Sequence, residues 1–428
     1  MLPKNPAEAL TSVTFEKYGT GERAGENLTR FGAFAWGEVV SLRVGCPRRL
    51  GVTAVVLRIN RDGQPPKDMP FTFLSSDYEQ GQDICELELD TAALCGLDAG
   101  GRRSGLFFYR LLLVRDQDTL FTDSRNNVDF TLGADGGQAF RLLVYDGGDP
   151  VPEWFGQGVL YHVFVDRFRR GAGAVRYQTG ARGAVMEPDW AHGIPPFAER
   201  QGDSLANNTF FGGNLWGVAE ALDYLADLGV RVLYLSPIFR AYSNHKYDTG
   251  DYLAVDEGFG GEAALDALLD KAKRYGIAVI LDGVFNHCGS FNKWLDREKI
   301  YAGRSGYEPG AYLDPESPYR KFFKFSDENG WPDNGSYEGW WDHNTLPKLN
   351  YEGSEVLYQY VLDIAKKWLS PPYNIDGWRL DVAADLGHSP EMNHQFWRDF
   401  RKVVKETNPD ALILAEHYGD GSSWLGGD

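Results

Sequence analysis

The sequence is poor in cysteine, in long apolar runs and in positive charge. Its four cysteines, Cys46, Cys85, Cys95 and Cys288, show no Cys-x-x-Cys spacing. This sparsity argues against a disulfide framework or a zinc ribbon and favours reduced thiols. No apolar run approaches the ~18 residues that cross a membrane, and residues 1–8 lack the apolar core of a secretion signal. We therefore expect a cytoplasmic protein.

Basic residues are outnumbered by acidic ones, 43 to 61, which gives a net charge of -18. A chain of this charge repels phosphate backbones and anionic lipid headgroups, so we expect no nucleic acid and no membrane partner. A neutral substrate is compatible with it. The 43% of hydrophobic residues and the 428-residue length indicate a folded chain with roughly two or three domains.

The first 150 residues contain short β-rich runs separated by clusters of Gly, Pro and Asp. That spacing predicts an N-terminal antiparallel β-sandwich over residues 1–150, with no helix. Residues 146–152, Asp-Gly-Gly-Asp-Pro-Val-Pro, have the composition of a linker. The clearest predicted strands are 52–59, 84–89, 106–114 and 139–145.

From about residue 151 the pattern changes to helices that alternate with strands. An amphipathic helix over 215–228 ends at Gly229 and is followed by a β-branched strand over 230–235. After the opening strand 159–165, such βα units predict a parallel sheet with right-handed connections. Three further helix and strand pairs follow: 265–272 with 277–281, 357–368 with a strand at 375, and a helix starting at Ser389-Pro390 with 411–415.

Polar residues stand at or just past the ends of these strands. In a (β/α)8 TIM barrel the active site lies at that end, so we predict a barrel over residues 151–428 rather than a doubly wound sheet. Two carboxylates, Asp381 and Glu416, follow successive strands. Glycosidic bond cleavage needs one ionised and one protonated carboxyl held close together. The residues at strand ends are Asp282, Asn286, His287, Arg379, Asp381 and Glu416.

The segment 288–350 is too long for an ordinary βα loop and is rich in aromatic residues. Loops of this length are usually functional, and we predict an inserted subdomain after the third strand. Most of its rings are expected to form a small core, and a few to face the cleft. They are Trp294, Tyr301, Tyr307, Tyr312, Tyr319, Trp331, Tyr337, Trp340 and Trp341.

Taken together, these motifs resemble the α-amylase superfamily of glycoside hydrolases, in its neopullulanase, cyclomaltodextrinase and amylopullulanase-like branch. The resemblance covers about residues 152–428, and the N-terminal sandwich fits the starch-binding-like domain of that branch. Five spaced motifs in the right order make the resemblance specific. They are Asp282-Gly-Val-Phe-Asn-His287, Gly377-Trp-Arg-Leu-Asp-Val-Ala383, Ala415-Glu416, Ser243-Asn-His-Lys-Tyr-Asp-Thr249 and Leu346-Pro-Lys-Leu-Asn350.

The resemblance implies a retaining mechanism with Asp381 as the nucleophile and Glu416 as the general acid and then base. Arg379, two residues earlier on the strand, should hold Asp381 ionised through a charge-assisted hydrogen bond. Glu416 has to be protonated before cleavage, so we expect a poorly solvated pocket or a negative neighbour around it.

Substrate contacts are carried over from the same motifs. His287 and Tyr247 resemble the residues that bind the sugar next to the cleaved bond, with Tyr247 stacking on the sugar face. His245 and Lys348 are weaker candidates for substrate binding. Two further residues are expected to brace loops rather than to touch substrate: Asp282 and Asn286.

Two departures from the family are visible. The loop that binds calcium in many relatives reads Arg169-Arg-Gly-Ala-Gly173 here and offers no carboxylate, so we predict no cofactor and no metal, and calcium at that loop is improbable. Only five barrel strands are apparent, and the family's later His-Asp pair has no match. We expect an incomplete barrel from a truncated product that has little activity alone.

The predicted function is a retaining α-glucan hydrolase acting on α-1,4 bonds of maltodextrins, cyclodextrins or pullulan, with α-1,6 cleavage left open. Two alternatives remain: a transglycosylase on the same scaffold, and an inactive glucan-binding fragment that lacks the later strands. The expected partners are α-glucan oligosaccharides. Relatives often dimerise through the N-terminal domain, so a homodimer also stays open.

Overall fold

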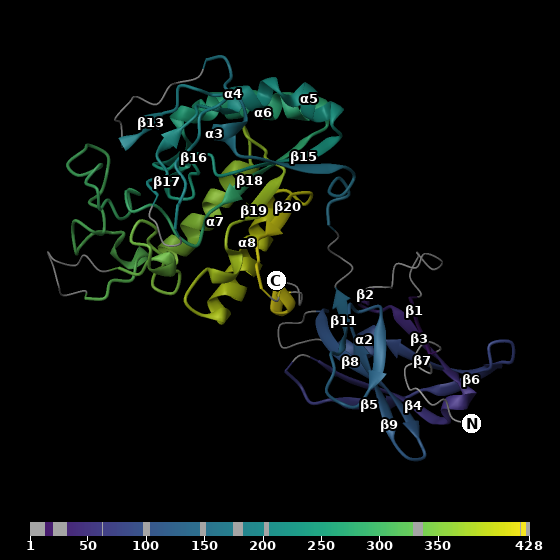
Figure 1. The fold of residues 1–428 in the computed structure, drawn as a ribbon. Helices are drawn as coiled ribbons and strands as arrows, with labels where there is room; N and C mark the ends of the chain where they lie inside the picture. Colours follow the sequence, from purple (N-terminus) through teal and green to yellow (C-terminus); the bar gives the residue numbers. More distant parts are fainter. Residues whose placement is uncertain are drawn as a thin grey trace. The chain divides into compact units, whose positions relative to one another are not determined.

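The computed structural model describes residues 13–19, 32–61, 63–96, 103–145, 151–173, 183–200, 205–327, 337–419 and 421–424. They form two compact units, one with the described residues up to 145 and from 419 on, the other with 151–418. The first is drawn mostly in purple and blue and the second in teal to yellow (Figure 1). Residues 146–150 of the expected linker lie outside the described ranges. Within those ranges, no helix has the length and apolarity needed to cross a membrane.

The first unit contains two sheets over one apolar core. The sheet β1-β3-β7-β6 is antiparallel throughout, whereas the larger sheet has one parallel pair, β11 with β2. The sequence had suggested a wholly antiparallel sandwich. That part of the prediction is wrong, because one pair of strands is parallel. The strands are β1 (Thr14–Gly19), β2 (Ala33–Ala35), β3 (Val39–Pro47), β4 (Val52–Arg61), β5 (Lys67–Pro70), β6 (Thr72–Asp77), β7 (Gln82–Asp90), β8 (Gly105–Arg115), β9 (Thr119–Ser124), β10 (Phe130–Gly133) and β11 (Phe140–Tyr145).

This unit also contains a short helix that sequence reasoning missed, α2 (Thr91–Cys95). Asp90 caps it, because its Oδ1 accepts hydrogen bonds from the backbone N–H groups of Ala92 and Ala93 at 2.9 and 3.2 Å. The cap makes a single helical turn stable directly after strand β7. With only five residues, the turn is too short to show a helical period in the sequence.

The second unit is built on a five-stranded parallel sheet with the order β12-β15-β18-β19-β20. Asp282 pairs with Arg379, and Arg379 pairs in turn with Leu414. This register places the ends of β18, β19 and β20 at one edge of the sheet. The strands are β12 (Val159–Val163), β15 (Val230–Leu235), β18 (Ala278–Gly283), β19 (Gly377–Leu380) and β20 (Leu412–Ala415).

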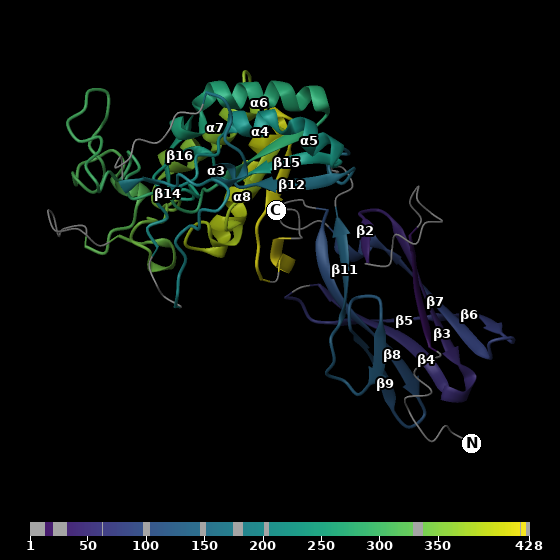
Figure 2. The same ribbon diagram turned by 45° about the horizontal axis from the view of Figure 1, so that its top comes forward.

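Helices between these strands begin and end largely where the sequence indicates. Ser389 caps α8 by accepting from the N–H of Met392 at 3.2 Å, and α6 ends at Gly276 in the left-handed region, with φ 63°. The helices α4, α5 and α6 lie side by side (Figure 2). The helices are α3 (Val165–Phe168), α4 (Leu215–Glu220), α5 (Leu222–Asp227), α6 (Gly261–Tyr275), α7 (Glu355–Leu369) and α8 (Pro390–Thr407).

The single helix predicted over 215–228 is two helices in the structure, α4 and α5. They meet at Ala221, whose N–H is shared between the carbonyl oxygens of Gly217 and Val218, both at 3.1 Å. Such sharing tightens one turn and interrupts the α-helical ladder. The apolar period continues across the break, because Leu222 and Leu225 are fully buried.

Among its described residues, the segment 288–350 has two 3₁₀ turns, η5 (Arg320–Phe322) and η6 (Trp340–Asp342), and isolated bridges. Several of its buried rings, such as Trp294, belong to the same core as the helices around the sheet. These rings do not form a core of their own, and the inserted subdomain stays a prediction. Trp331 lies outside the described residues.

Candidate active site

Three neighbouring strands bring the expected catalytic side chains to one edge of the sheet. Asp282 lies on β18 and Arg379 on β19, while Asp381 and Glu416 directly follow β19 and β20. The backbone keeps this register past the strands, because Asp381 N donates to the carbonyl of Gly283 at 3.1 Å, and Glu416 N donates to that of Leu380 at 2.9 Å. The four side chains thus meet at the carboxyl ends of parallel strands.

The Arg379 guanidinium contacts all three carboxylates. Its Nη1 lies 3.0 and 3.1 Å from the two oxygens of Asp282 and 2.8 Å from Asp381 Oδ1. Its Nη2 lies 2.8 Å from Glu416 Oε2, which also accepts the N–H of Val382 at 2.8 Å. Asp381 and Glu416 therefore share one cation, which brings both carboxylates into the same small region.

Three acids around one cation leave an excess of negative charge in a poorly hydrated place. Asp282 is 1% and Asp381 7% exposed. Burial raises the pKa of Asp282 to about 7 and that of Asp381 to about 6, although Arg379 lowers both. Glu416 adds to the rise of the Asp381 pKa because it is a like charge. Arg379 thus favours the ionised form of Asp381.

Of the two surroundings expected for Glu416, the structure has the negative neighbour, because Asp381 interacts electrostatically with it, and not the poorly solvated pocket. Its side chain remains 37% exposed. The reason lies in the sheet order, because β20 has β19 as its neighbour on one side and no described strand on the other. Arg379 and the N–H of Val382 are therefore its polar contacts on the sheet side.

Asp282 receives further hydrogen bonds from two tyrosines. The hydroxyl of Tyr234, on β15, donates to Asp282 Oδ2, and the hydroxyl of Tyr247 donates to the same oxygen at 3.2 Å. Sequence reasoning assigned Asp282 to loop bracing, whereas the structure places it against Arg379. It also missed Tyr234, because that residue stands in an apolar run and reads as core. His162, on β12, was missed too; its ring stacks on Tyr234 at 4.4 Å.

His287 presents an unpaired ring nitrogen. Its Nδ1 lies 3.2 Å from the side-chain amide of Asn286, while its buried Nε2 has no hydrogen-bond partner among the described residues. Burial lowers the pKa of His287 to about 3, so the ring is neutral. If Nδ1 accepts from the Asn286 amide, Nε2 carries the proton and is free to donate. Asn286 therefore acts on His287 itself.

The two weaker substrate candidates, Lys348 and His245, have different contacts. Lys348 pairs with His287 through the backbone, because the segment 346–350 returns alongside residues 286–288. His245 accepts the N–H of Tyr247 at its Nδ1, at 3.1 Å, and burial lowers its pKa. His245 also lines a cavity of about 340 Å³ with Phe164, Arg167, Pro195, Pro196, Leu205, Ala206, Asn207, Asn208, Thr209 and Asn244.

An outer aromatic cluster is formed by Trp340, Trp341 and Tyr418, two of which bind Asp385. Trp340 Nε1 and the Tyr418 hydroxyl both donate to Asp385 Oδ2, at 2.8 and 2.7 Å. Trp341 stacks on Trp340 at 4.9 Å, and Trp340 stacks on His287 at 5.1 Å. Trp341 and Tyr418 are 68% and 61% exposed. Trp341 has left-handed backbone angles, φ 48° and ψ 39°, which are costly for a bulky residue and are often found at functional sites.

The loop after β12 does not fit a calcium ion. Asp166 is fully buried and accepts the N–H groups of Phe211 and Gly212 at 3.0 and 3.1 Å. The carbonyl of Phe211 in turn accepts from Arg170 Nε at 2.6 Å. Protein donors thus occupy the oxygen atoms that a cation would need. Across the described ranges, no group of three His, Cys, Asp or Glu side chains could hold a metal.

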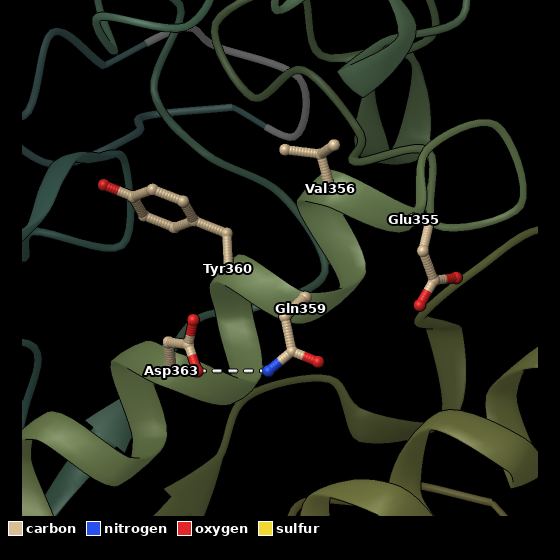
Figure 3. Close-up of a pocket in the computed structure, with 5 residues that line it drawn as sticks. All are labelled: Glu355, Val356, Gln359, Tyr360 and Asp363. Carbon is tan, nitrogen blue, oxygen red and sulfur yellow. Dashed lines mark hydrogen bonds between the residues drawn. The ribbon is translucent and has the colours of Figure 1, made fainter.

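Another hollow, of about 420 Å³, lies on α7 (Figure 3). Gln359 donates to Asp363 there at 3.1 Å. None of the expected site residues lines it. Its lining is Glu355, Val356, Gln359, Tyr360 and Asp363.

Comparison with known proteins gives a consistent result. The family described as alpha amylase, catalytic domain, matches residues 162–425. An amylopullulanase of Thermoanaerobacterium saccharolyticum is 32% identical over 93% of this chain, and neopullulanase 2 of Thermoactinomyces vulgaris is 38% identical over 65%. A solved cyclomaltodextrinase is 29% identical over 94% of the chain, with a TM-score of 0.57. The type III pullulan hydrolase from Thermococcus kodakarensis is 26% identical over 91%, with a TM-score of 0.55.

The chain spans only part of these proteins. It covers 31% of the amylopullulanase and 41% of the neopullulanase. Of the two solved chains, it covers 61% and 60%.

Proposed function

Because this chain belongs to the α-amylase family, we propose that it carries the cleavage site of a retaining α-glucan hydrolase. The proposed targets are α-1,4 bonds of maltodextrins, cyclodextrins or pullulan, with α-1,6 bonds left open. The observation that carries the proposal is the shared guanidinium: Asp381 and Glu416 both lie 2.8 Å from nitrogens of Arg379. The names of the relatives, amylopullulanase, neopullulanase and cyclomaltodextrinase, support the substrate class.

In the proposed mechanism, Asp381 Oδ attacks the anomeric carbon while Glu416 protonates the departing glycosidic oxygen, so that one C–O bond forms as the other breaks. Retention requires the two carboxyls about 5 to 5.5 Å apart. A water molecule then gives its proton to the Glu416 carboxylate and attacks the same carbon, which releases Asp381. Arg379 keeps Asp381 ionised during the wait for substrate.

Neutral His287 supports the same reading of the site. Its buried Nε2 has no described partner and so has a hydrogen bond to give to a sugar hydroxyl. Tyr247 is fixed by its bond to Asp282, at 3.2 Å, which holds its ring in place for stacking on a sugar face. Both residues would thus bind the sugar, while the two carboxylates would carry out the cleavage.

Trapping of the covalent intermediate tests the nucleophile without requiring fast turnover. We expect a 5-fluoro-α-glucosyl fluoride to label the chain once, on the peptide that contains Asp381, as measured by mass spectrometry. Asp381→Asn should abolish labelling and retain maltooligosaccharide binding. Label on another residue would refute the assignment. Saturable binding with no label would favour the glucan-binding fragment instead.

Transglycosylation is a second candidate because of the outer aromatic cluster. Exposed Trp341 and Tyr418 offer apolar faces on which an acceptor sugar can stack in competition with water. At high maltose concentration we expect products longer than the substrate, and fewer of them in Trp341→Ala. Chromatography of the products measures this ratio, and a ratio unchanged by Trp341→Ala would remove the cluster from the acceptor site.

A further inference from the structure

Tyr234 is a buried phenol that lies against the catalytic charges without being one of them. It is 8% exposed, on β15, two strands away from Arg379. Its hydroxyl donates to Asp282 Oδ2, and the guanidinium carbon of Arg379 lies 5.7 Å from the centre of its ring. Tyr234 therefore contacts both Asp282 and Arg379, the ion pair to which Asp381 is bonded through Arg379.

Asp282 is the hub of this arrangement. Its two oxygens accept hydrogen bonds from Tyr234, Tyr247 and Arg379. Asp282 is fully buried and has no described acceptor within reach, so all of these bonds favour its ionised form. Only the ionised form offers a full counter-charge to Arg379.

The titratable groups near Asp282 come from the two neighbouring strands, β15 and β19, from the loop that carries Tyr247, and from β12, which is the next strand beyond β15. Besides Tyr234 and Tyr247 they are Arg379 and Asp381 on or after β19, and His162 on β12, whose ring stacks on Tyr234. His162 Nε2 is 2.8 Å from Ser236 Oγ, and burial followed by the charge of Arg379 lowers its pKa, so it is neutral and adds no charge. The balance therefore rests on Asp282, Arg379 and the two outer carboxylates.

We propose that Tyr234 is a positioning residue of the catalytic site: by donating to Asp282 it keeps that carboxylate charged, so that Asp282 competes with Asp381 and Glu416 for the guanidinium of Arg379. The catalytic role of Tyr234 rests on the proposed function, whereas its effect on Asp282 and Arg379 rests on the described contacts alone. Tyr234 acts through Asp282 and Arg379 and touches no substrate.

Removal of the Tyr234 hydroxyl should shift the titration midpoints of Asp282 and Asp381 in known directions. In Tyr234→Phe, Asp282 loses one hydrogen bond to its charged form, so its titration midpoint should rise by about 1 to 2 pH units. A neutral Asp282 no longer repels Asp381 or competes for Arg379, so the midpoint of Asp381 should fall. In an active enzyme the acid limb of kcat/KM, which reports ionisation of Asp381, should move to lower pH in the same way.

The decisive measurement is a titration of the whole chain by NMR, with aspartate labelled by ¹³C at the carboxyl. Because it needs no turnover, it is independent of the proposed activity. Asp282→Asn and Asp381→Asn assign the two signals. Tyr351→Phe is the matched control, because it removes a buried phenol that donates to the carbonyl of Phe285 and to no carboxylate.

The proposal requires opposite shifts of Asp282 and Asp381 in Tyr234→Phe and unchanged midpoints in the control. In an Asp282→Asn background, Tyr234→Phe should leave the Asp381 midpoint where it is. Unchanged midpoints in Tyr234→Phe, shifts equal to those of the control, or a further shift of Asp381 in the double variant would each overturn it. If Tyr234→Phe fails to fold, Asp282→Asn alone still tests it through the predicted fall of the Asp381 midpoint.

Discussion

Replacement of Arg379 by methionine is the most informative perturbation of the site, because one side chain balances three acids. The guanidinium side chain is 12% exposed and contacts Asp282, Asp381 and Glu416 within 3.1 Å. Methionine fills similar space without charge. Loss of one partner from a buried ion pair costs about 3 to 5 kcal/mol, because the remaining charges are left uncompensated.

The cost should depend on pH, with a sign fixed by the pKa shifts. The folded-state pKa values of Asp282 and Asp381, about 7 and about 6, lie above those of the unfolded chain, and Arg379 lowers both. Without Arg379 they rise further. A carboxyl group whose pKa is raised in the folded state destabilises the fold at pH values above that pKa, where the group is ionised. This destabilisation disappears as the pH falls, because the group takes up a proton.

We therefore expect Arg379→Met to lower the free energy of unfolding by about 3 to 5 kcal/mol near pH 8, and by only about 1 to 2 kcal/mol near pH 5, where lost hydrogen bonds remain. Urea denaturation followed by tryptophan fluorescence of the second unit measures both. Arg240→Met, which breaks an exposed pair with Glu257, should cost less than about 1 kcal/mol at either pH. Equal losses for Arg379→Met at both pH values would refute the electrostatic argument.

Three smaller predictions follow from single contacts. His287→Phe should weaken maltooligosaccharide binding about tenfold by calorimetry, since a buried donor is lost, while thermal stability changes little; unchanged affinity would remove His287 from the sugar site. Ser389→Ala should cost about 1 kcal/mol in urea, through loss of the cap bond to Met392 N at 3.2 Å, whereas Ser389→Asp should retain stability. Gly250→Ala should lower the melting temperature, because the added Cβ would lie 2.1 Å from a ring carbon of Phe291, and over-packing costs about 1 to 3 kcal/mol; an unchanged melting temperature would show that the ring moves freely.

The sequence predicted helix ends best where a side chain or a glycine marks them. Ser389-Pro390 and Gly276 are local signals, and the structure confirms both. The break at Ala221 carries no such signal, because alanine favours helices and the apolar period continues across it. The parallel pairing of β2 with β11 joins residues more than a hundred positions apart, which no local pattern encodes.

At the site, the sequence brought out residues with unusual chemistry and missed those with ordinary chemistry. Asp282, Arg379, Asp381 and Glu416 stand out as charges after apolar strands, and the structure brings them together. Tyr234 looks like one more apolar residue of a strand, and only the pairing of β15 with β18 brings it to Asp282. The exposure of Glu416 depends on which strands flank β20, which is also a matter of sheet order.

The charges at the ends of β18, β19 and β20 favour one register of these strands, in addition to their proposed role in the chemistry. Asp282 and Arg379 are 97 positions apart in the chain, so their pairing is a non-local contact with a larger loop-closure cost than the contacts within a helix. A slip of one residue between two of these strands would turn every side chain of one strand to the opposite face. In such a slipped sheet, the Arg379 guanidinium would lie on the opposite face, toward the helices, and would contact none of the three carboxylates. The same charges proposed to cleave a sugar thus penalise each wrong alignment of the strands that carry them.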